Sequence, residues 1–136
     1  MAEFLFRDMV EKAGRSAEFE IASSAVSEEE IWNGIGNPVY PPVKKLLSDL
    51  GISCAGKRAQ LLTRADGEKY DLILCMDGSN LRRAKAIVGE KYADKCQKLL
   101  SFAGEKGDVA DPWYTRDFGA TYQDVYKSLQ GLLENV

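Results

Sequence analysis

Residues 108–118, DVADPWYTRDF, hold the side chains best suited to chemistry, because an acid stands before a proline and two large aromatic residues. A carboxylic acid at Asp111 can deliver a proton to a leaving group, and such general acid catalysis accelerates reactions by about 10²- to 10⁴-fold. Trp113 and Tyr114 offer flat faces on which an aromatic ring can pack. The alternative is structural, because aspartate before proline is common in turns and aromatic residues often belong to a core or its rim.

A proton donor needs a partner that attacks the substrate, and the chain offers few candidates. The sequence contains no histidine, which excludes a Ser-His-Asp triad, a Cys-His dyad and the usual zinc sites. We therefore expect no metal and no cofactor. The three cysteines, which are odd in number and far apart and so are expected to be reduced thiols, are Cys54, Cys75 and Cys96. The residues six positions after them, none of which is arginine, are Gln60, Leu81 and Phe102.

Length and charge limit the class of protein. A chain of 136 residues, 45% of them hydrophobic, is of the size of one domain, which we place at residues 1–136. The net charge of -3 is spread without a basic block, which disfavours binding to nucleic acid. No apolar run reaches the roughly 20 residues that span a bilayer, and the start lacks the features of an exported precursor, so we expect a cytoplasmic protein.

Apolar spacing predicts four helices. Residues 2–13 carry apolar side chains at helical intervals and end at a glycine, and the segment that opens at Pro41 and ends at Gly51 shows the same pattern. Residues 80–88, with Ser79 as the expected cap, form the third helix. The last helix, which begins before Tyr122, has an apolar stripe that reaches the end of the chain.

Strands are expected between these helices. The clearest is YDLILCMD, residues 70–77, which is an apolar run too short for a helix and typical of a buried parallel strand. Cys75 lies inside this run and is therefore interpreted as a small core residue. FEIAS (19–23), AQLLT (59–63) and KLLSF (98–102) are the other expected strands, and residues 24–40 are expected to form a long loop.

Alternating strands and helices predict an α/β fold, a three-layer parallel sheet with helices on both faces. Ligands of such sheets bind at the carboxyl ends of the strands. The segments that leave three of the expected strands are ASSAVS, CMDGSN and GDVADPWY. These segments are expected to converge on one rim, where the site would lie.

Four segments, taken in order, resemble the low-molecular-weight protein tyrosine phosphatases. They are MAEFLFRDMV, IGNPVYPPVKKLLSDLGI, YDLILCMDGSNLR and DPWY followed by a helix that contains tyrosine. The resemblance covers nearly all of residues 1–136 and implies a flavodoxin-like fold. It also implies hydrolysis of phosphotyrosine through a phosphocysteine intermediate, with phosphotyrosine proteins or small aryl phosphates as substrates.

The resemblance assigns roles to several residues of this chain. Asp111 would be the general acid and base, and Pro112 would fix its loop. Trp113 and Tyr114 would wall the slot for the substrate ring, with Trp32 opposite. Two further positions are supporting: Ser23 would brace the phosphate-binding loop, and Asp77 would cap a helix rather than take part in the chemistry.

The nucleophile of the family is missing from these residues. In the family it lies in a Cys-x5-Arg loop that ends in Arg-Ser-Pro, and the next residues are matched here by Met1, Ala2 and Glu3. The chain is therefore expected to be N-terminally truncated and to lack the first, central strand of the sheet. Burial of about five apolar residues is worth roughly 10 kcal/mol, which is comparable to the stability of a whole domain. We accordingly expect rearranged strands or a strand exchanged within a homo-oligomer.

Three functions are consistent with the sequence. The first is a protein tyrosine phosphatase by family that is inactive or nearly so as this chain. The second is a non-catalytic interaction or self-assembly module. The third is an arsenate reductase of the same fold, which is disfavoured because it needs the same loop and a pair of resolving cysteines, of which only Cys75 lies in the relevant region.

Overall fold

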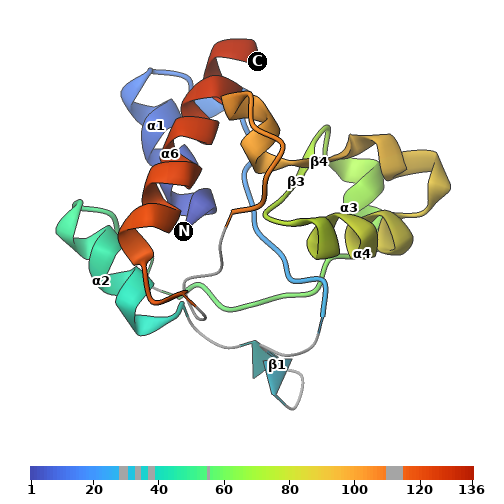
Figure 1. Ribbon diagram of the computed structural model, residues 1–136, viewed down its shortest axis with the longest axis horizontal. Helices are drawn as coiled ribbons and strands as arrows, with labels where there is room; N and C mark the ends of the chain where they lie inside the picture. Colours follow the sequence, from blue (N-terminus) through green and yellow to red (C-terminus); the bar gives the residue numbers. More distant parts are fainter. Residues whose placement is uncertain (28–30, 33–34, 37–38, 55, 110–114) are drawn as a thin grey trace. The chain divides into compact units, whose positions relative to one another are not determined.

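The computed structural model describes residues 1–27, 31–32, 35–36, 39–54, 56–109 and 115–136 (Figure 1). The chain divides into two compact units, Met1–Gln60 and Leu61–Val136. The single domain expected over residues 1–136 stays a prediction. None of the helices in the described ranges is long and apolar enough to cross a membrane.

The first unit opens with helix α1 (Ala2–Lys12), which confirms the helix predicted over residues 2–13. Leu5, Phe6 and Val10 are buried, as the helical spacing of the apolar residues requires. The chain turns after the helix through Gly14, whose φ of 71° is a conformation that glycine adopts without strain. The ring of Phe6 then packs edge-on against Phe19, with 5.4 Å between the ring centroids.

Helix α2 (Pro41–Asp49) is the second predicted helix of this unit and is confirmed. Proline in the first turn suits a helix start, because the missing N–H is one that the helix would leave unpaired. Val43 and Leu47, one turn apart, are its buried residues. Gly51, with φ of 76°, follows the helix, as the sequence predicted.

The connection between the two helices differs from the prediction. Residues 16–18 form a short 3-10 helix, η1 (Ser16–Glu18), and the strand predicted at 19–23 is wrong. A strand is stabilised by a ladder of backbone hydrogen bonds to a neighbouring strand. This segment is held instead by isolated hydrogen bonds, such as the one from the Arg7 guanidinium to the Ile21 carbonyl at 2.6 Å. The loop predicted over residues 24–40 contains a short antiparallel pair, β1 (Ile31–Trp32) and β2 (Ile35–Gly36), in the register Ile31↔Gly36 and Trp32↔Ile35.

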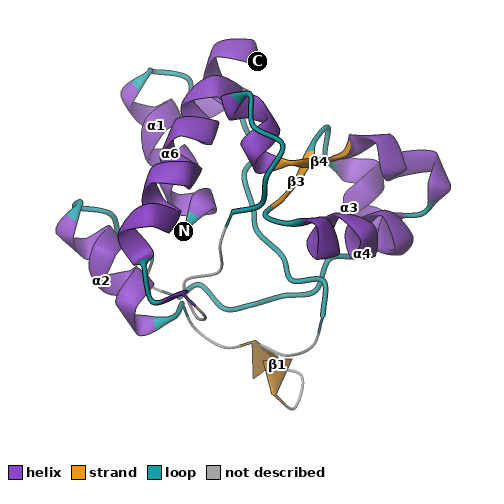
Figure 2. Ribbon diagram, in the orientation of Figure 1, coloured by secondary structure: helices purple, strands orange, loops and turns teal. Residues whose placement is uncertain are grey.

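The second unit is built around two parallel strands, β3 (Ile73–Cys75) and β4 (Cys96–Lys98), drawn in orange in Figure 2. Their register pairs Ile73 with Cys96 and Cys75 with Lys98. Helix α4 (Gly78–Val88) and the 3-10 helix η3 (Glu90–Lys95) contact this pair, and helix α3 (Arg64–Lys69) packs against both of them (Figure 1). Helix α4 confirms the prediction over residues 80–88, but its cap is Asp77 and not Ser79, because the Asp77 carboxylate accepts from the Asn80 N–H at 2.7 Å.

The strand predicted at 98–102 is also wrong, apart from Lys98, which ends β4. Residues 99–103 form the 3-10 helix η4 (Leu99–Ala103), whose Leu99 and Leu100 are buried. The final helix, α6 (Phe118–Asn135), lies along η4 and buries Val125, Ser128, Leu129 and Leu132. The apolar run that was interpreted as a strand is therefore covered by a helix instead of being paired with a neighbouring strand.

The fold class is confirmed in part. A parallel strand pair with helices is present, as predicted, in the second unit. Within the described ranges, no third strand joins β3 and β4. The wider flavodoxin-like sheet, and the rearranged or exchanged strand expected in it, are not seen in these residues.

Candidate functional site

Most of the predicted site residues lie outside the part of the chain that the structure describes. They are Asp111, Pro112, Trp113 and Tyr114, the proposed acid, its proline and the ring walls. Trp32 belongs to β1 by its backbone, and its side chain is outside the description. The structure does describe the residues that flank positions 110–114 on both sides.

The segment before Asp111 is attached to the carboxyl end of β3. The Val109 N–H donates to the Met76 carbonyl at 2.8 Å, and the Asp108 carboxylate accepts from the Gly78 N–H at 3.2 Å. Residues 108–109 therefore lie beside residues 76–78, which leave the carboxyl end of β3, the kind of edge where ligands of parallel sheets bind. Asp111 itself, three residues after Asp108 in the sequence, lies outside the described residues.

The segment after Asp111 is attached to the start of α6. The Asp117 N–H donates to the Thr115 hydroxyl at 3.1 Å, and the Asp117 carboxylate accepts from the Ala120 N–H at 2.9 Å. Asp117 is thus the N-cap of α6. Arg116 has a φ of 60°, which is uncommon for a residue with a side chain and marks a tight turn into the helix.

Ser23, the predicted loop support, is part of a polar cluster in the first unit. Its hydroxyl donates to Glu3 Oε1 at 2.7 Å, and the same carboxylate pairs with Lys57 Nζ at 2.8 Å and with Arg7 at 3.0 Å. The Ser23 carbonyl also accepts from Lys57, at 3.2 Å. We call Glu3, Arg7, Ser23 and Lys57 the Glu3 cluster.

The charge on Glu3 is sustained by these partners. Burial of the side chain raises the pKa of the Glu3 carboxyl, but hydrogen bonds from Lys57 and Ser23 outweigh it and hold the pKa below its usual value. Glu3 is therefore an ionised carboxylate in the first turn of α1, where the positive end of the helix dipole also favours it.

Glu3 and Lys57 were not identified from the sequence. Glu3 lies within an amphipathic helix and Lys57 lies 54 residues further along the chain. The only local signal was an acid in the first turn of the predicted helix, a position where acids are common for reasons of stability alone.

The cysteines of the second unit are not activated nucleophiles. Cys75 and Cys96 are free and buried, as is Cys54 in the first unit. Burial raises the pKa of the Cys75 thiol to about 11 and raises the pKa of Cys96 as well. A thiolate is the reactive form, so these two thiols are inert near neutral pH. The placement of Cys75 in β3 supports its interpretation as a core residue.

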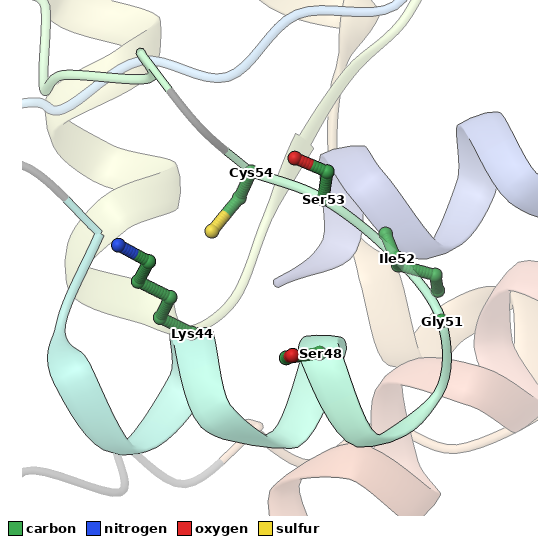
Figure 3. A pocket seen from close by; sticks show the side chains of 6 residues that line it. All are labelled: Lys44, Ser48, Gly51, Ile52, Ser53 and Cys54. Carbon is green, nitrogen blue, oxygen red and sulfur yellow. The ribbon is translucent and has the colours of Figure 1, made fainter.

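Cys54 lines a cavity of about 320 Å³ in the first unit. Its other lining residues are Lys44, Ser48, Gly51, Ile52 and Ser53. Figure 3 shows the Lys44 and Cys54 side chains extending toward the same space, one from α2 and the other from the segment that follows. Within the described ranges no group of three or more acids or cysteines could hold a metal ion.

Comparisons with known proteins agree on one family. The family model described as "Low molecular weight phosphotyrosine protein phosphatase" matches residues 1–136. A Sus scrofa protein of that same description is 36% identical over 141 residues, a match that covers all of this chain and 86% of the relative. The Bacillus subtilis protein YfkJ, a low-molecular-weight protein-tyrosine-phosphatase by name, is 29% identical over all of this chain and 86% of its own length.

Solved structures support the same fold. The crystal structure of YfkJ superposes with a TM-score of 0.90, at 28% identity, and covers 98% of this chain and 83% of that chain. The structure of Vibrio vulnificus Wzb in complex with benzylphosphonate superposes with a TM-score of 0.82 and covers 99% of this chain and 88% of that chain. Because its identity is 20%, it bears on the fold alone.

Proposed function

The chain belongs to the low-molecular-weight phosphotyrosine protein phosphatase family, and we propose that Asp111 is its general acid and base in the hydrolysis of phosphotyrosine monoesters. The observation that carries the proposal is the family match, which runs through residues 1–136 and so includes Asp111. The Bacillus subtilis and Sus scrofa relatives are named as phosphatases that act on phosphotyrosine in proteins, and such enzymes are hydrolases.

The proposed reaction has two steps. In the first, a cysteine thiolate attacks phosphorus, the bond to the phenolic oxygen breaks, and the Asp111 carboxylic acid protonates the departing phenolate. In the second, the Asp111 carboxylate takes a proton from water, which attacks the phosphocysteine and releases phosphate and the thiolate. The carboxyl group ends the cycle protonated, as it began.

The aromatic residues would select an aryl ester. Trp113 and Tyr114 follow the acid directly, and we assign to them and to Trp32 the walls of a slot for the substrate ring. Pro112 would limit the conformations of the loop.

The attacking thiolate is the part that residues 1–136 do not supply. None of the three cysteines is followed by an arginine six residues later. The raised pKa values of Cys75 and Cys96 also oppose their use as nucleophiles. We therefore propose that a polypeptide of these 136 residues, taken alone, is inactive or nearly so.

The Glu3 cluster supports a positioning role for Ser23. The Ser23 hydroxyl donates to the carboxylate of Glu3, which lies in the first turn of α1, two residues after Met1. We propose that this cluster holds the start of α1 in place against any phosphate-binding loop that precedes it, since helix N-termini stabilise bound anions.

The experiment compares two polypeptides. Residues 1–136 alone are expected to release no p-nitrophenol from p-nitrophenyl phosphate above the rate in buffer. An extended chain that carries a strand and a Cys-x5-Arg loop ahead of Met1 is expected to turn the ester over, and replacement of the loop cysteine by serine is the matched control. Turnover by the 136 residues at the rate of the extended chain would contradict the proposal.

A second candidate is a non-catalytic interaction or self-assembly module. The observation in its favour is that the described thiols of the second unit are buried and have raised pKa values. An extended chain that folds but releases no p-nitrophenol, together with a concentration-dependent molar mass in light scattering, would support this candidate instead.

A further inference from the structure

We propose that Asp108 is a positioning residue for Asp111, and that it fixes the segment carrying the general acid to the start of α4 through Lys98 and the backbone of Gly78. The inference rests on the proposed role of Asp111. It concerns a residue three positions upstream, for which the motif that suggests the acid assigns no function.

The Asp108 carboxylate has two partners on different elements. Oδ1 lies 2.7 Å from Nζ of Lys98, the last residue of β4, and accepts from the N–H of Gly78, the first residue of α4, at 3.2 Å. We call Asp108, Lys98 and Gly78 the Asp108 clamp. A carboxylate suits both contacts, because it pairs with the lysine and also sits at the positive end of the helix dipole.

The surrounding charges favour the ionised form of Asp108. The bond to Lys98 is the main cause of a lowered pKa for the Asp108 carboxyl, with smaller contributions from the Gly78 N–H and the charge of Arg82. Lys98 Nζ also donates to the Lys106 carbonyl at 3.3 Å, so the lysine is held on the same stretch of chain.

Val109 provides a second attachment next to the clamp. Its N–H donates to the Met76 carbonyl at 2.8 Å, and its side chain is among the buried residues, with 5% exposure. Two consecutive residues are therefore fixed immediately before positions 110–114. Asp111 follows Val109 by two residues in the sequence, so this attachment lies next to the segment that carries the acid.

Such an anchor matters more for position than for stability. The Lys98 side chain is 28% exposed and that of Asp108 is 51% exposed, and ion pairs as exposed as this contribute little to the stability of a fold. A general acid, in contrast, is sensitive to placement, since a displacement of about 1 Å can lower a rate by roughly 10²-fold. Loss of the clamp is expected to leave the unit folded and the acid misplaced.

The first readout uses the 136-residue chain itself. Replacement of Trp32 by phenylalanine leaves Trp113, two residues after Asp111, as the single tryptophan. In that background Asp108→Ala is expected to raise the amplitude of the fast component in the Trp113 anisotropy decay by about twofold. Asp108→Asn is expected to lie between it and the parent, because the amide oxygen can still accept hydrogen bonds but no longer forms an ion pair with Lys98. Asp71→Asn, a matched change at an exposed acid of the same unit, is expected to leave the decay unchanged.

The second readout separates positioning of the acid from a merely structural effect. A general acid matters most when the leaving phenolate is strongly basic, so phenyl phosphate depends on it more than p-nitrophenyl phosphate does. In the extended chain, Asp108→Asn is expected to lower kcat for phenyl phosphate by about tenfold more than kcat for p-nitrophenyl phosphate. A structural defect would lower both rates by similar factors.

The outcomes distinguish this inference from the proposed function. If Asp111→Asn slows phenyl phosphate strongly and Asp108→Asn slows the two esters equally, Asp108 is not a positioning residue, although the role of Asp111 stands. If Asp111→Asn has no effect, the proposed function is wrong and the inference fails with it. If the extended chain turns over neither ester, the anisotropy decay decides: an unchanged decay in both Asp108 variants overturns the inference, and a faster decay in the graded order supports it.

Discussion

Replacement of Lys57 by methionine tests whether the Glu3 cluster is a coupled unit. The change removes a cation 2.8 Å from a carboxylate whose side chain is only 3% exposed. Removing one partner of a buried ion pair costs about 3–5 kcal/mol when the remaining charge has no other partner. Glu3 keeps Arg7 at 3.0 Å and the Ser23 hydroxyl at 2.7 Å, so we expect a smaller loss of roughly 2–3 kcal/mol in the free energy of unfolding.

The reverse change is expected to cost less. In Glu3→Gln Lys57 loses its carboxylate partner but keeps its bond to the Ser23 carbonyl at 3.2 Å. Its side chain is 20% exposed and can turn toward water, and the amide oxygen of the new glutamine can still accept from Ser23. We expect a loss of about 1–2 kcal/mol. The double variant Glu3→Gln/Lys57→Met buries no unpaired charge and should be more stable than the sum of the single losses predicts, by at least about 0.5 kcal/mol.

Urea unfolding at neutral pH, followed by circular dichroism, measures these free energies. The matched control is Lys12→Met, which removes an exposed partner of Asp8 in the same helix and is expected to cost less than about 0.5 kcal/mol. Additive losses in the double variant, or a loss for Lys57→Met no larger than that for Lys12→Met, would refute the reasoning.

Three further expectations follow from the structure. In Gly131→Ala the added Cβ would overlap the Phe102 carbonyl oxygen, so urea unfolding should show a loss of about 1–3 kcal/mol in the free energy of unfolding. In Gly119→Ala, in the same helix, the added Cβ meets only an ordinary contact, and the change should be neutral or stabilising. Equal effects of the two changes would contradict this prediction. Burial raises the pKa of the Cys75 thiol to about 11, so this thiol should react with iodoacetamide far more slowly at pH 7 than an exposed thiol does. Mass spectrometry measures the labelling, and rapid labelling of Cys75 in the folded chain would contradict its assignment as a buried core residue. The pKa of Glu3 is lower in the folded state than in the unfolded chain, so its ionisation stabilises the fold above the ordinary pKa of glutamate, and this contribution is lost as pH falls through the lowered pKa. The acid-induced loss of stability should therefore be smaller in Glu3→Gln, and identical curves of stability against pH for the two proteins would exclude it.

Helices were predictable from the sequence because their information is local. The apolar spacing in residues 2–13 and 80–88 identified α1 and α4 to within two residues at each end. For the cap of α4, the residue pattern suggested Ser79, which is wrong, and the family resemblance suggested Asp77, which is confirmed. Both residue types cap helices well, and only the backbone geometry decides between them.

Strands were predicted less well because pairing is not local. FEIAS has strand-forming residues but no neighbouring ladder in the described part of the chain, and KLLSF is apolar but forms η4 beneath α6. The run that was predicted correctly, YDLILCMD, contains β3, which has β4 beside it. A short apolar run is therefore ambiguous until its partner is known.

The residues of the candidate site also differ in whether local sequence or only the fold reveals them. Asp111 was identified from a contiguous motif, whereas Glu3 and Lys57 meet across 54 residues of sequence and carried no signal that linked them. Asp108 stood in the first segment considered, yet its role depends on Lys98 and Gly78, and only the fold brings these three residues together.

The central claim is that Asp111 delivers the proton to the leaving phenolate, and the most direct measurement is the pH dependence of kcat for phenyl phosphate in the extended chain. Asp111→Asn is expected to lower kcat by about 10²- to 10⁴-fold and to remove the fall in rate on the alkaline side, where the acid loses its proton. The control Asp71→Asn is expected to follow the parent profile. An Asp111→Asn variant that keeps the parent kcat and the parent alkaline limb would contradict the claim.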